Sequence, residues 1–233
     1  MKIGVFDSGI GGLNVLSELL KKYPNNQYIY LGDTLNLPYG NKSHDELLEL
    51  SMNNINFLIS KDVDMIIIAC GTVSSNCYLE LIDKYQIPIY DIITPTINYL
   101  KTIKSRIGVI ATNRTIESHI FKINDNVLEL ATPEFVPIIE NNVIDDNIDL
   151  INEKINELGN INYLVLGCTH YPLIKDVIKK DVNFIDMGKC LVDTINLTNI
   201  GDRKIDLYFT KIDDTLKENI KKIIKDKYEV FEK

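Results

Sequence analysis

Met65-Ile-Ile-Ile-Ala-Cys-Gly-Thr72 decides the fold, because it joins a run of apolar strand residues to a cysteine, small residues and a helical segment. Tyr163-Leu-Val-Leu-Gly-Cys-Thr-His170 repeats this plan in the second half of the chain. A short, continuously apolar run fits a strand of a parallel sheet that is covered on both faces. The two segments therefore predict a strand–turn–helix unit in each half of an α/β protein.

Short apolar runs and longer amphipathic segments alternate along the rest of the chain, as is typical of α/β architecture. In the first half we predict strands at Lys2–Phe6, Gln27–Gly32, Asp64–Cys70 and Pro88–Ile92, and helices at Gly12–Lys22, Ser43–Ser60 and Ser74–Tyr85. In the second half we predict strands at Arg106–Ala111, Phe135–Ile139, Tyr163–Gly167 and Asn183–Asp186, and helices at Thr115–Phe121, Asp149–Leu158 and Leu173–Lys180. A last helix–strand–helix–strand set is expected from Cys190 to Phe231.

Two local signals refine this plan. Ser43, followed three residues later by Glu46, predicts a capping box at the start of a helix. The neighbourhood of Thr94-Pro95 is the best boundary between two lobes, with a return near Gly188. We therefore expect residues 1–93 and 188–233 to form one lobe and residues 94–187 to form the other.

Composition limits the classes of function. The 233 residues are 45% hydrophobic and 25% charged, so the chain can bury a core and disorder is excluded. A net charge of −8 argues against a nucleic acid or an anionic membrane as partner. No apolar run is long enough for a signal peptide or a membrane span, so we expect a cytoplasmic protein.

Four cysteines occur without a C-x-x-C pair, so neither a structural zinc site nor a disulfide-exchange motif is indicated. Cys77 and Cys190 are expected inside helices as buried apolar residues. His44 and His119 are expected to be solvated on helices. The other two cysteines, Cys70 and Cys168, follow predicted strands.

Ligands of open parallel sheets bind at the carboxyl ends of the strands, so the residues that follow each strand deserve comparison. Asp7-Ser-Gly-Ile-Gly-Gly12 is a tight turn before a helix, and its N–H groups could hold an anion. It lacks the G-x-G-x-x-G spacing and has no P-loop lysine, so nucleotide binding is weakly indicated. A purely structural strand-to-helix turn is an equally good interpretation.

Cys70 and Cys168 occupy matched positions, each between a strand and a helix. A thiol at a helix N-terminus should have a pKa below its ordinary value of about 8.5. Asp7 is a candidate proton partner for Cys70, and His170 for Cys168. A single such cysteine would more often be a small buried apolar residue, but two in matched settings favour a chemical role.

Two matched acid/base groups on opposite sides of a ligand suit inversion at a carbon atom. One thiolate would remove a proton from one face while the opposite thiol donates a proton to the other. Removal of a proton next to a carboxylate without a cofactor needs close positioning, exclusion of water and donors aimed at the developing charge. A cleft between two lobes can supply all three.

The motifs that carry this chemistry resemble those of the glutamate racemases in the aspartate/glutamate racemase superfamily, over nearly the whole chain. They are Gly4-Val-Phe-Asp-Ser-Gly-Ile-Gly-Gly-Leu13, Gly32-Asp-Thr34, Pro38-Tyr-Gly-Asn-Lys-Ser43, Ile68-Ala-Cys-Gly-Thr72, Gly108-Val-Ile-Ala-Thr112, Thr115-Ile-Glu-Ser118, Phe135-Val-Pro-Ile-Ile-Glu140 and Leu166-Gly-Cys-Thr-His-Tyr-Pro-Leu173. The resemblance implies two pseudo-symmetric α/β lobes, each with a mostly parallel sheet, and an active site in the cleft between them. It implies no cofactor and no metal, with glutamate as the small-molecule substrate and a homodimer as a possible assembly.

The resemblance also implies roles for individual residues. Cys70 would deprotonate the D isomer and Cys168 the L isomer, with Asp7 and His170 as their partners. Asp33 and Glu140 would support them in the catalytic group. The implied substrate contacts, many of them hydroxyl groups or backbone donors, are Ser8, Pro38, Tyr39, Gly40, Gly71, Thr72, Thr112, Thr115 and Thr169.

Three departures from the family pattern affect specificity more than fold. Gly71 stands where the family has Asn, Leu35-Asn36 stands where it has Ala-Arg, and the region between Glu140 and Tyr163 is shorter than usual. The leading hypothesis is a cofactor-independent glutamate racemase that supplies D-glutamate for peptidoglycan in a bacterial cell wall. The alternatives are a sister racemase acting on aspartate or another amino acid, motivated by Gly71, and a catalytically weak amino-acid-binding protein.

Overall fold

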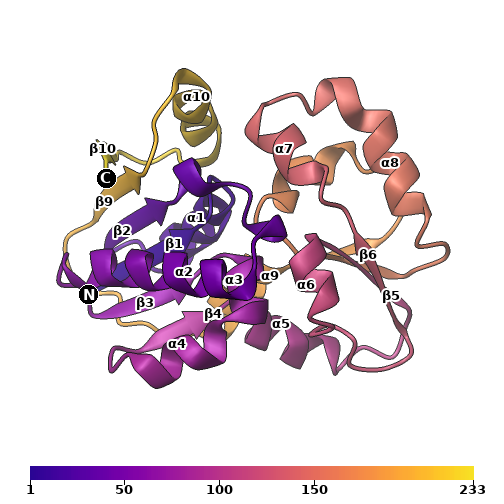
Figure 1. The fold of residues 1–233 in the computed structure, drawn as a ribbon, viewed down its shortest axis with the longest axis horizontal. Helices are drawn as coiled ribbons and strands as arrows, with labels where there is room; N and C mark the ends of the chain where they lie inside the picture. The colour runs from indigo at the N-terminus through magenta and orange to yellow at the C-terminus, as the bar shows by residue number, and fades with distance from the viewer.

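The computed structural model describes residues 1–233 and contains two parallel β-sheets flanked by helices (Figure 1). The first sheet has the order β10-β9-β2-β1-β3-β4 and the second the order β6-β5-β7-β8. The strands of the first sheet are β1 (Lys2–Asp7), β2 (Gln27–Gly32), β3 (Met65–Ile68), β4 (Ile89–Asp91), β9 (Lys204–Phe209) and β10 (Glu229–Glu232). Those of the second are β5 (Ile107–Ala111), β6 (Val127–Ala131), β7 (Tyr163–Leu166) and β8 (Asn183–Asp186). The predicted α/β class with two parallel-sheet lobes is confirmed.

The helices fall into groups that follow the two sheets (Figure 1). The helices near the first sheet are α1 (Gly12–Lys22), α2 (His44–Ile59), α3 (Gly71–Asn76), α4 (Tyr78–Lys84) and α10 (Asp214–Ile223). Those near the second are α6 (Asn113–Glu117), α7 (Phe135–Glu140) and α8 (Ile148–Asn156). The chain crosses to the second sheet through α5 (Ile93–Leu100) and returns through α9 (Met187–Thr194), and these two helices pack on each other.

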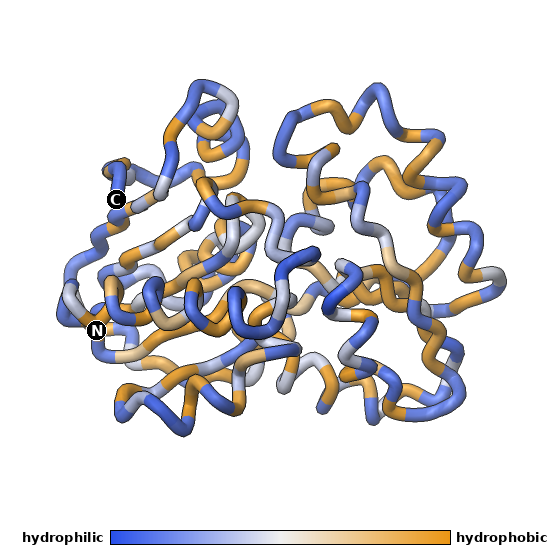
Figure 2. The backbone as a smooth tube through the Cα atoms, in the orientation of Figure 1, coloured by the Kyte–Doolittle hydropathy of each residue, from blue (hydrophilic) through white to orange (hydrophobic).

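The central strands form the core because their side chains are apolar on both faces. Ile3, Val5, Ile67 and Val165 are fully buried. Figure 2 shows the same pattern, with hydrophobic segments inside each lobe and hydrophilic segments at the outer turns. Strands of this kind are stabilised by helices on both faces, as in other parallel sheets.

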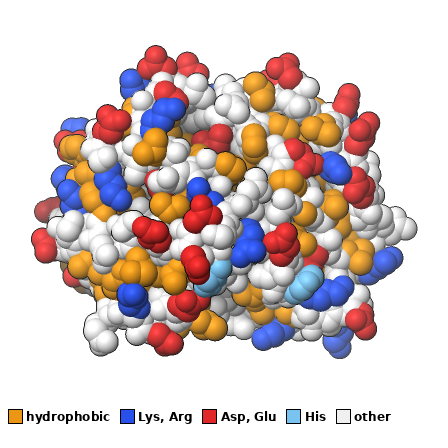
Figure 3. Space-filling model, in the orientation of Figure 1, with side chains coloured by type: hydrophobic (Ala, Val, Ile, Leu, Met, Phe, Trp, Pro, Cys, Tyr) orange, Lys and Arg blue, Asp and Glu red, His pale blue; other side chains and the backbone are white.

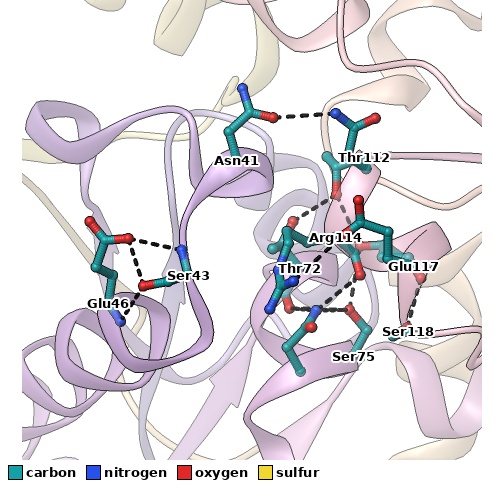
Figure 4. Close-up of polar contacts among 12 residues, drawn as sticks. Asn41, Ser43, Glu46, Thr72, Ser75, Thr112, Arg114, Glu117 and Ser118 are labelled. Carbon is teal, nitrogen blue, oxygen red and sulfur yellow. Dashed lines mark hydrogen bonds and ion pairs between the residues drawn. The ribbon is translucent and has the colours of Figure 1, made fainter.

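The predicted capping box is present at the start of α2. The Ser43 hydroxyl accepts from the Glu46 backbone N–H at 3.3 Å, and the Glu46 carboxylate accepts from the Ser43 N–H at 2.8 Å (Figure 4). The cap fixes where the loop that carries Tyr39 and Gly40 ends and the helix begins.

The prediction of a strand at Phe135–Ile139 is wrong. These residues form α7, whose four apolar side chains Phe135, Val136, Ile138 and Ile139 are all buried. A short apolar run does not distinguish a buried helix from a buried strand, and Pro137 is tolerated in the first turn of a helix. The strand in this region is β6, Val127–Ala131, which the sequence analysis did not assign.

Three predicted helices also differ from the structure. The helix expected at Thr115–Phe121 is α6, Asn113–Glu117, and His119, beyond its end, has φ +52°. The helix expected at Ser74–Tyr85 is divided into α3 and α4, because Cys77 has φ −124° and ψ −9° and interrupts the helical backbone. The helix expected at Leu173–Lys180 is a 3₁₀ helix over Tyr171–Val177, in which the Leu173 N–H bonds to the His170 carbonyl at 3.0 Å.

The surface carries both signs of charge. Figure 3 shows acidic and basic side chains interspersed over both lobes on the face that it draws. None of the helices combines the length and the apolar character that crossing a membrane requires. His44 contacts Glu80 at 2.8 Å and His119 contacts Glu129 at 3.4 Å, both at the surface.

Candidate active site

One pocket collects residues from the carboxyl ends of six strands, three in each sheet. This is where an open parallel sheet binds its ligands. The expected site residues that line it are Ser8, Pro38, Tyr39, Gly40, Cys70, Gly71, Thr72, Thr112, Cys168, Thr169 and His170. Leu37, Asn41, Pro133 and Val136 line it as well. The sequence analysis missed the last two because it did not assign β6, the strand that precedes them.

Four expected site residues do not line the pocket: Asp7, Asp33, Thr115 and Glu140. Thr115 is fully buried behind Thr112, and the two hydroxyl oxygens are 3.1 Å apart. The other three are carboxylates that hold groups of the pocket wall in position, as their hydrogen bonds indicate.

Asp7, at the end of β1, organises the glycine turn that follows it. Its Oδ2 accepts from the N–H groups of Gly9 at 3.2 Å and Gly12 at 2.9 Å. Its Oδ1 accepts from the Thr169 hydroxyl of the other lobe at 3.2 Å. The carboxylate therefore links the two sides of the pocket.

Three N–H groups of the glycine turn are bonded within the protein. Gly9 and Gly12 donate to Asp7, and the Ile10 N–H donates to Glu140 Oε1 at 3.1 Å. Carboxylates of the protein thus occupy part of the turn, and anion binding by its remaining N–H groups stays a prediction.

Cys70 precedes α3 and is almost fully buried. Burial, and next to it the negative charge of Asp7, raise the pKa of this thiol far above its ordinary range. The Val73 backbone N–H and the Ser8 side chain favour the thiolate, as expected at a helix N-terminus, but they do not outweigh burial. The prediction of a lowered pKa is therefore wrong for Cys70, which holds its proton at neutral pH.

Cys168 lies beside an imidazole that is linked in turn to a carboxylate. The Cys168 Sγ is 3.6 Å from His170 Nδ1, and His170 Nε2 is 2.5 Å from Glu140 Oε1. Burial disfavours a charged imidazole, but the hydrogen bonds to Cys168 and Glu140 prevail and raise the pKa of His170 well above 6.5. The imidazolium can then donate one N–H to the sulfur and the other to the carboxylate.

Asp33 supports the wall of the pocket through Tyr39. The Tyr39 hydroxyl donates to Asp33 Oδ2 at 2.5 Å and accepts from Asn54 Nδ2 at 3.1 Å. Thr210 and Asn36 also donate to the same carboxylate. Burial and the Asp33 charge raise the pKa of the Tyr39 phenol, so its proton stays in this hydrogen bond.

Gly71 lies where the two lobes approach each other closely. A Cβ atom at this position would be 3.0 Å from the Gly167 carbonyl oxygen and 3.3 Å from the Met187 Cε. The carbonyl belongs to the backbone and would have to shift by a few tenths of an ångström. A side chain at this position, where the family pattern has Asn, would therefore fit tightly.

A second cavity, of about 260 Å³, shares Leu37, Pro38 and Val136 with the pocket and extends to Lys211 and Asp213. The pocket that both cysteines line has a volume of about 20 Å³. That is enough for about one water molecule. No group of three or more His, Cys, Asp or Glu side chains is arranged to hold a metal ion.

Comparisons with known proteins agree with this geometry. The Asp/Glu/Hydantoin racemase family profile matches residues 38–195. The glutamate racemase of Hydrogenobaculum sp. is 36% identical over 99% of this chain and 95% of its own length, and that of Persephonella marina is 40% identical over 88% and 87%. The crystal structure of Francisella tularensis glutamate racemase with D-glutamate superposes with a TM-score of 0.86 at 29% identity, covering 100% of this chain and 96% of that one. The chain therefore belongs to the Asp/Glu/Hydantoin racemase family and is an amino-acid racemase.

Proposed function

We propose that this protein interconverts L- and D-glutamate without a cofactor, with Cys70 and Cys168 as its two acid/base groups. The observation that carries the proposal is that these cysteines follow strands of different sheets and line one pocket. Curated relatives named glutamate racemase support glutamate as the substrate.

The reaction begins with the Cys168 thiolate on one face of L-glutamate. The Cα–H bond breaks, the proton joins the Cys168 sulfur, and the electron pair moves into the adjacent carboxylate group. The Cys70 S–H then donates its proton to the opposite face of Cα, which yields D-glutamate and a Cys70 thiolate. The reverse direction uses the same steps with the roles exchanged.

The two environments suit this division of labour. His170 can stabilise the Cys168 thiolate through its Nδ1–H, while burial keeps Cys70 protonated as the donor. A thiolate with a raised pKa is also a stronger base, which helps Cys70 to remove the poorly acidic Cα proton of the D isomer. Asp7 raises that pKa further through its charge.

Substrate access requires movement, because a volume of about 20 Å³ is far too small for glutamate. We propose that residues 1–93 with 188–233 and residues 94–187 move as two lobes about α5 and α9. Closure around the substrate would exclude water and align both thiols.

The family resemblance also suggests a biological role for the reaction. It supports a role in supplying D-glutamate for peptidoglycan, and with it cell-wall biogenesis and cell shape. It also supports a cytoplasmic location and a homodimer.

The deciding experiment is proton NMR of L-glutamate and, separately, L-aspartate in D₂O with purified protein and no added cofactor. We expect the Cα proton signal of glutamate to disappear while D-glutamate accumulates. Reaction of aspartate alone would support a sister racemase, for which Gly71 supplies the motive. Absence of exchange with both substrates would contradict the proposed function.

A further inference from the structure

Four hydroxyl groups form a continuous hydrogen-bonded chain between the lobes (Figure 4). Thr72 Oγ1 is 2.9 Å from Thr112 Oγ1, Thr112 Oγ1 is 3.1 Å from Thr115 Oγ1, and Ser75 Oγ is 3.4 Å from Thr115 Oγ1. Thr72 and Ser75 belong to α3, whereas Thr112 and Thr115 belong to the start of α6. Only Thr72 and Thr112 reach the catalytic pocket.

Such a chain has two possible proton orders, because each hydroxyl has one hydrogen and can donate or accept. In the outward order, Ser75 donates to Thr115, Thr115 to Thr112 and Thr112 to Thr72, so the Thr72 O–H is free to point into the pocket. In the inward order every bond is reversed, and Thr72 offers only a lone pair. A carboxylate in the pocket favours the outward order.

Asn76 lies beside Ser75, at the end of the hydroxyl chain that does not reach the pocket. Its Nδ2 is 2.9 Å from the Thr72 carbonyl oxygen, 2.8 Å from Ser75 Oγ and 3.3 Å from the Arg114 carbonyl oxygen. Because backbone carbonyls only accept, the amide end that faces them must be the NH₂ group. The NH₂ group has two hydrogens for three acceptors, and the two shorter distances assign them to Ser75 Oγ and the Thr72 carbonyl.

This donation constrains the Ser75 hydrogen. The Ser75 hydroxyl has two acceptors in reach, Thr115 Oγ1 at 3.4 Å and the Thr72 carbonyl at 3.1 Å. Asn76 fills one of the two lone pairs on the Thr72 carbonyl and one of the two on Ser75 Oγ, and a second hydrogen bond accepted by either oxygen is weaker than the first. Both effects favour donation from Ser75 to Thr115, which is the first bond of the outward order.

We propose that Asn76 is a positioning residue that sets the outward proton order of this chain, so that Thr72 presents its O–H to a substrate carboxylate. The inference deepens the proposed function and rests on it for the identity of the substrate. The chemistry itself requires only a carboxylate ligand in the pocket.

The test replaces the donor at position 76 by an acceptor. Asn76→Asp replaces the NH₂ group by an acceptor, so Ser75 donates to position 76 and the chain takes the inward order. We expect the dissociation constant of glutarate, measured by calorimetry, to rise about tenfold, as for the loss of one hydrogen bond to a charged group. The KM for L-glutamate should rise to a similar extent, with a smaller change in kcat.

A second variant separates the effect of proton order in the hydroxyl chain from the effect of the negative charge that Asp introduces. Thr115→Val interrupts the chain and leaves position 76 where it is. In this background Asn76→Asp should change glutarate affinity less than about threefold, since only through-space repulsion remains. Ser118→Ala is the matched control for Thr115→Val, because it removes a nearby hydroxyl that lies outside the hydroxyl chain. Ser118 donates to the Thr115 carbonyl at 2.7 Å.

The outcomes distinguish the two proposals. An Asn76→Asp effect that is equal in both backgrounds would overturn the inference, as would a wild-type protein that does not bind glutarate. Failure of the wild-type protein to racemise glutamate, with the chain-dependent loss of glutarate affinity intact, would overturn the proposed function alone. Circular dichroism melting of every variant checks that the fold is retained.

Discussion

At the residue scale, the two thiols differ in what surrounds them. Cys70 is buried against the charge of Asp7, and Cys168 faces an imidazolium. The matched sequence positions therefore give unmatched chemical environments. Asp7 reaches Cys70 from the neighbouring strand β1, whereas His170 lies two residues after Cys168 in the same segment.

The first prediction concerns these thiols. Cys70→Ser and Cys168→Ser should each lower kcat for racemisation by about 10²–10⁴-fold, because a serine hydroxyl donates its proton less readily than a thiol and is not ionised to act as a base. Glutarate binding, measured by calorimetry, should change little. Cys190→Ser, at a partly exposed site on α9, is the control. Racemisation that persists in the double variant would contradict the two-thiol mechanism.

The second prediction concerns Gly71. Gly71→Asn should lower the free energy of unfolding by about 1–3 kcal/mol, because its Cβ would press on the Gly167 carbonyl at 3.0 Å. We also expect a lower kcat, since the two lobes would be forced apart. Gly159→Asn is the control, because Gly159 has φ +61°, which Asn tolerates, and no neighbour within 4 Å. A fully active and equally stable Gly71→Asn protein would refute this.

At the element scale, short helices begin at the pocket and their first turns carry its side chains. The segment between β2 and α2 supplies Tyr39 and Gly40 to the pocket and ends at the Ser43 cap. The capping box fixes this junction through two reciprocal hydrogen bonds.

The third prediction tests that cap. Ser43→Ala should lower the free energy of unfolding by about 1 kcal/mol, because the Glu46 N–H loses its acceptor. Urea denaturation measures the change. Ser60→Ala, at the opposite end of α2, removes an exposed hydroxyl that bonds only the Phe57 carbonyl and should have a smaller effect. Equal losses in the two variants would contradict the role of the cap.

At the scale of the whole molecule, burial of thiols makes stability depend on pH. Burial raises the pKa of Cys77 to about 12 and that of Cys190 to about 11. In the unfolded chain a thiol titrates near 8.5. The folded state therefore keeps protons that the unfolded state loses, so this stabilisation is complete below about pH 8.5 and is lost as the pH rises toward the folded-state values.

The fourth prediction follows from this sign. The free energy of unfolding should fall between pH 8.5 and pH 10, and the fall should be shallower in Cys77→Ala, which lacks one buried thiol. Urea titrations at the two pH values measure both slopes. Leu81→Ala, a neighbouring buried deletion without a titrating group, should keep the wild-type slope despite its lower stability. A Cys77→Ala protein with the wild-type slope would show that the Cys77 thiol does not contribute to the pH dependence of stability.

The sequence alone determined the features that depend on neighbouring residues. Central strands such as β2 and the capping box at Ser43 follow from local apolar runs and caps, so they were predicted within a residue or two. The cysteines and hydroxyl residues of the pocket were predicted from the residues directly after each strand, because the carboxyl ends of parallel strands lie at one edge of the sheet.

Tertiary structure alone decided what depends on distant residues. Glu140 accepts from the Ile10 N–H from 130 positions away and so occupies one donor of the glycine turn. Burial next to Asp7 reverses the expected direction of the Cys70 pKa. Packing makes Phe135–Glu140 a helix, and the meeting of α3 and α6 creates the hydroxyl chain behind the pocket. Electrostatic and packing energies depend on distance in space, which local sequence patterns do not contain.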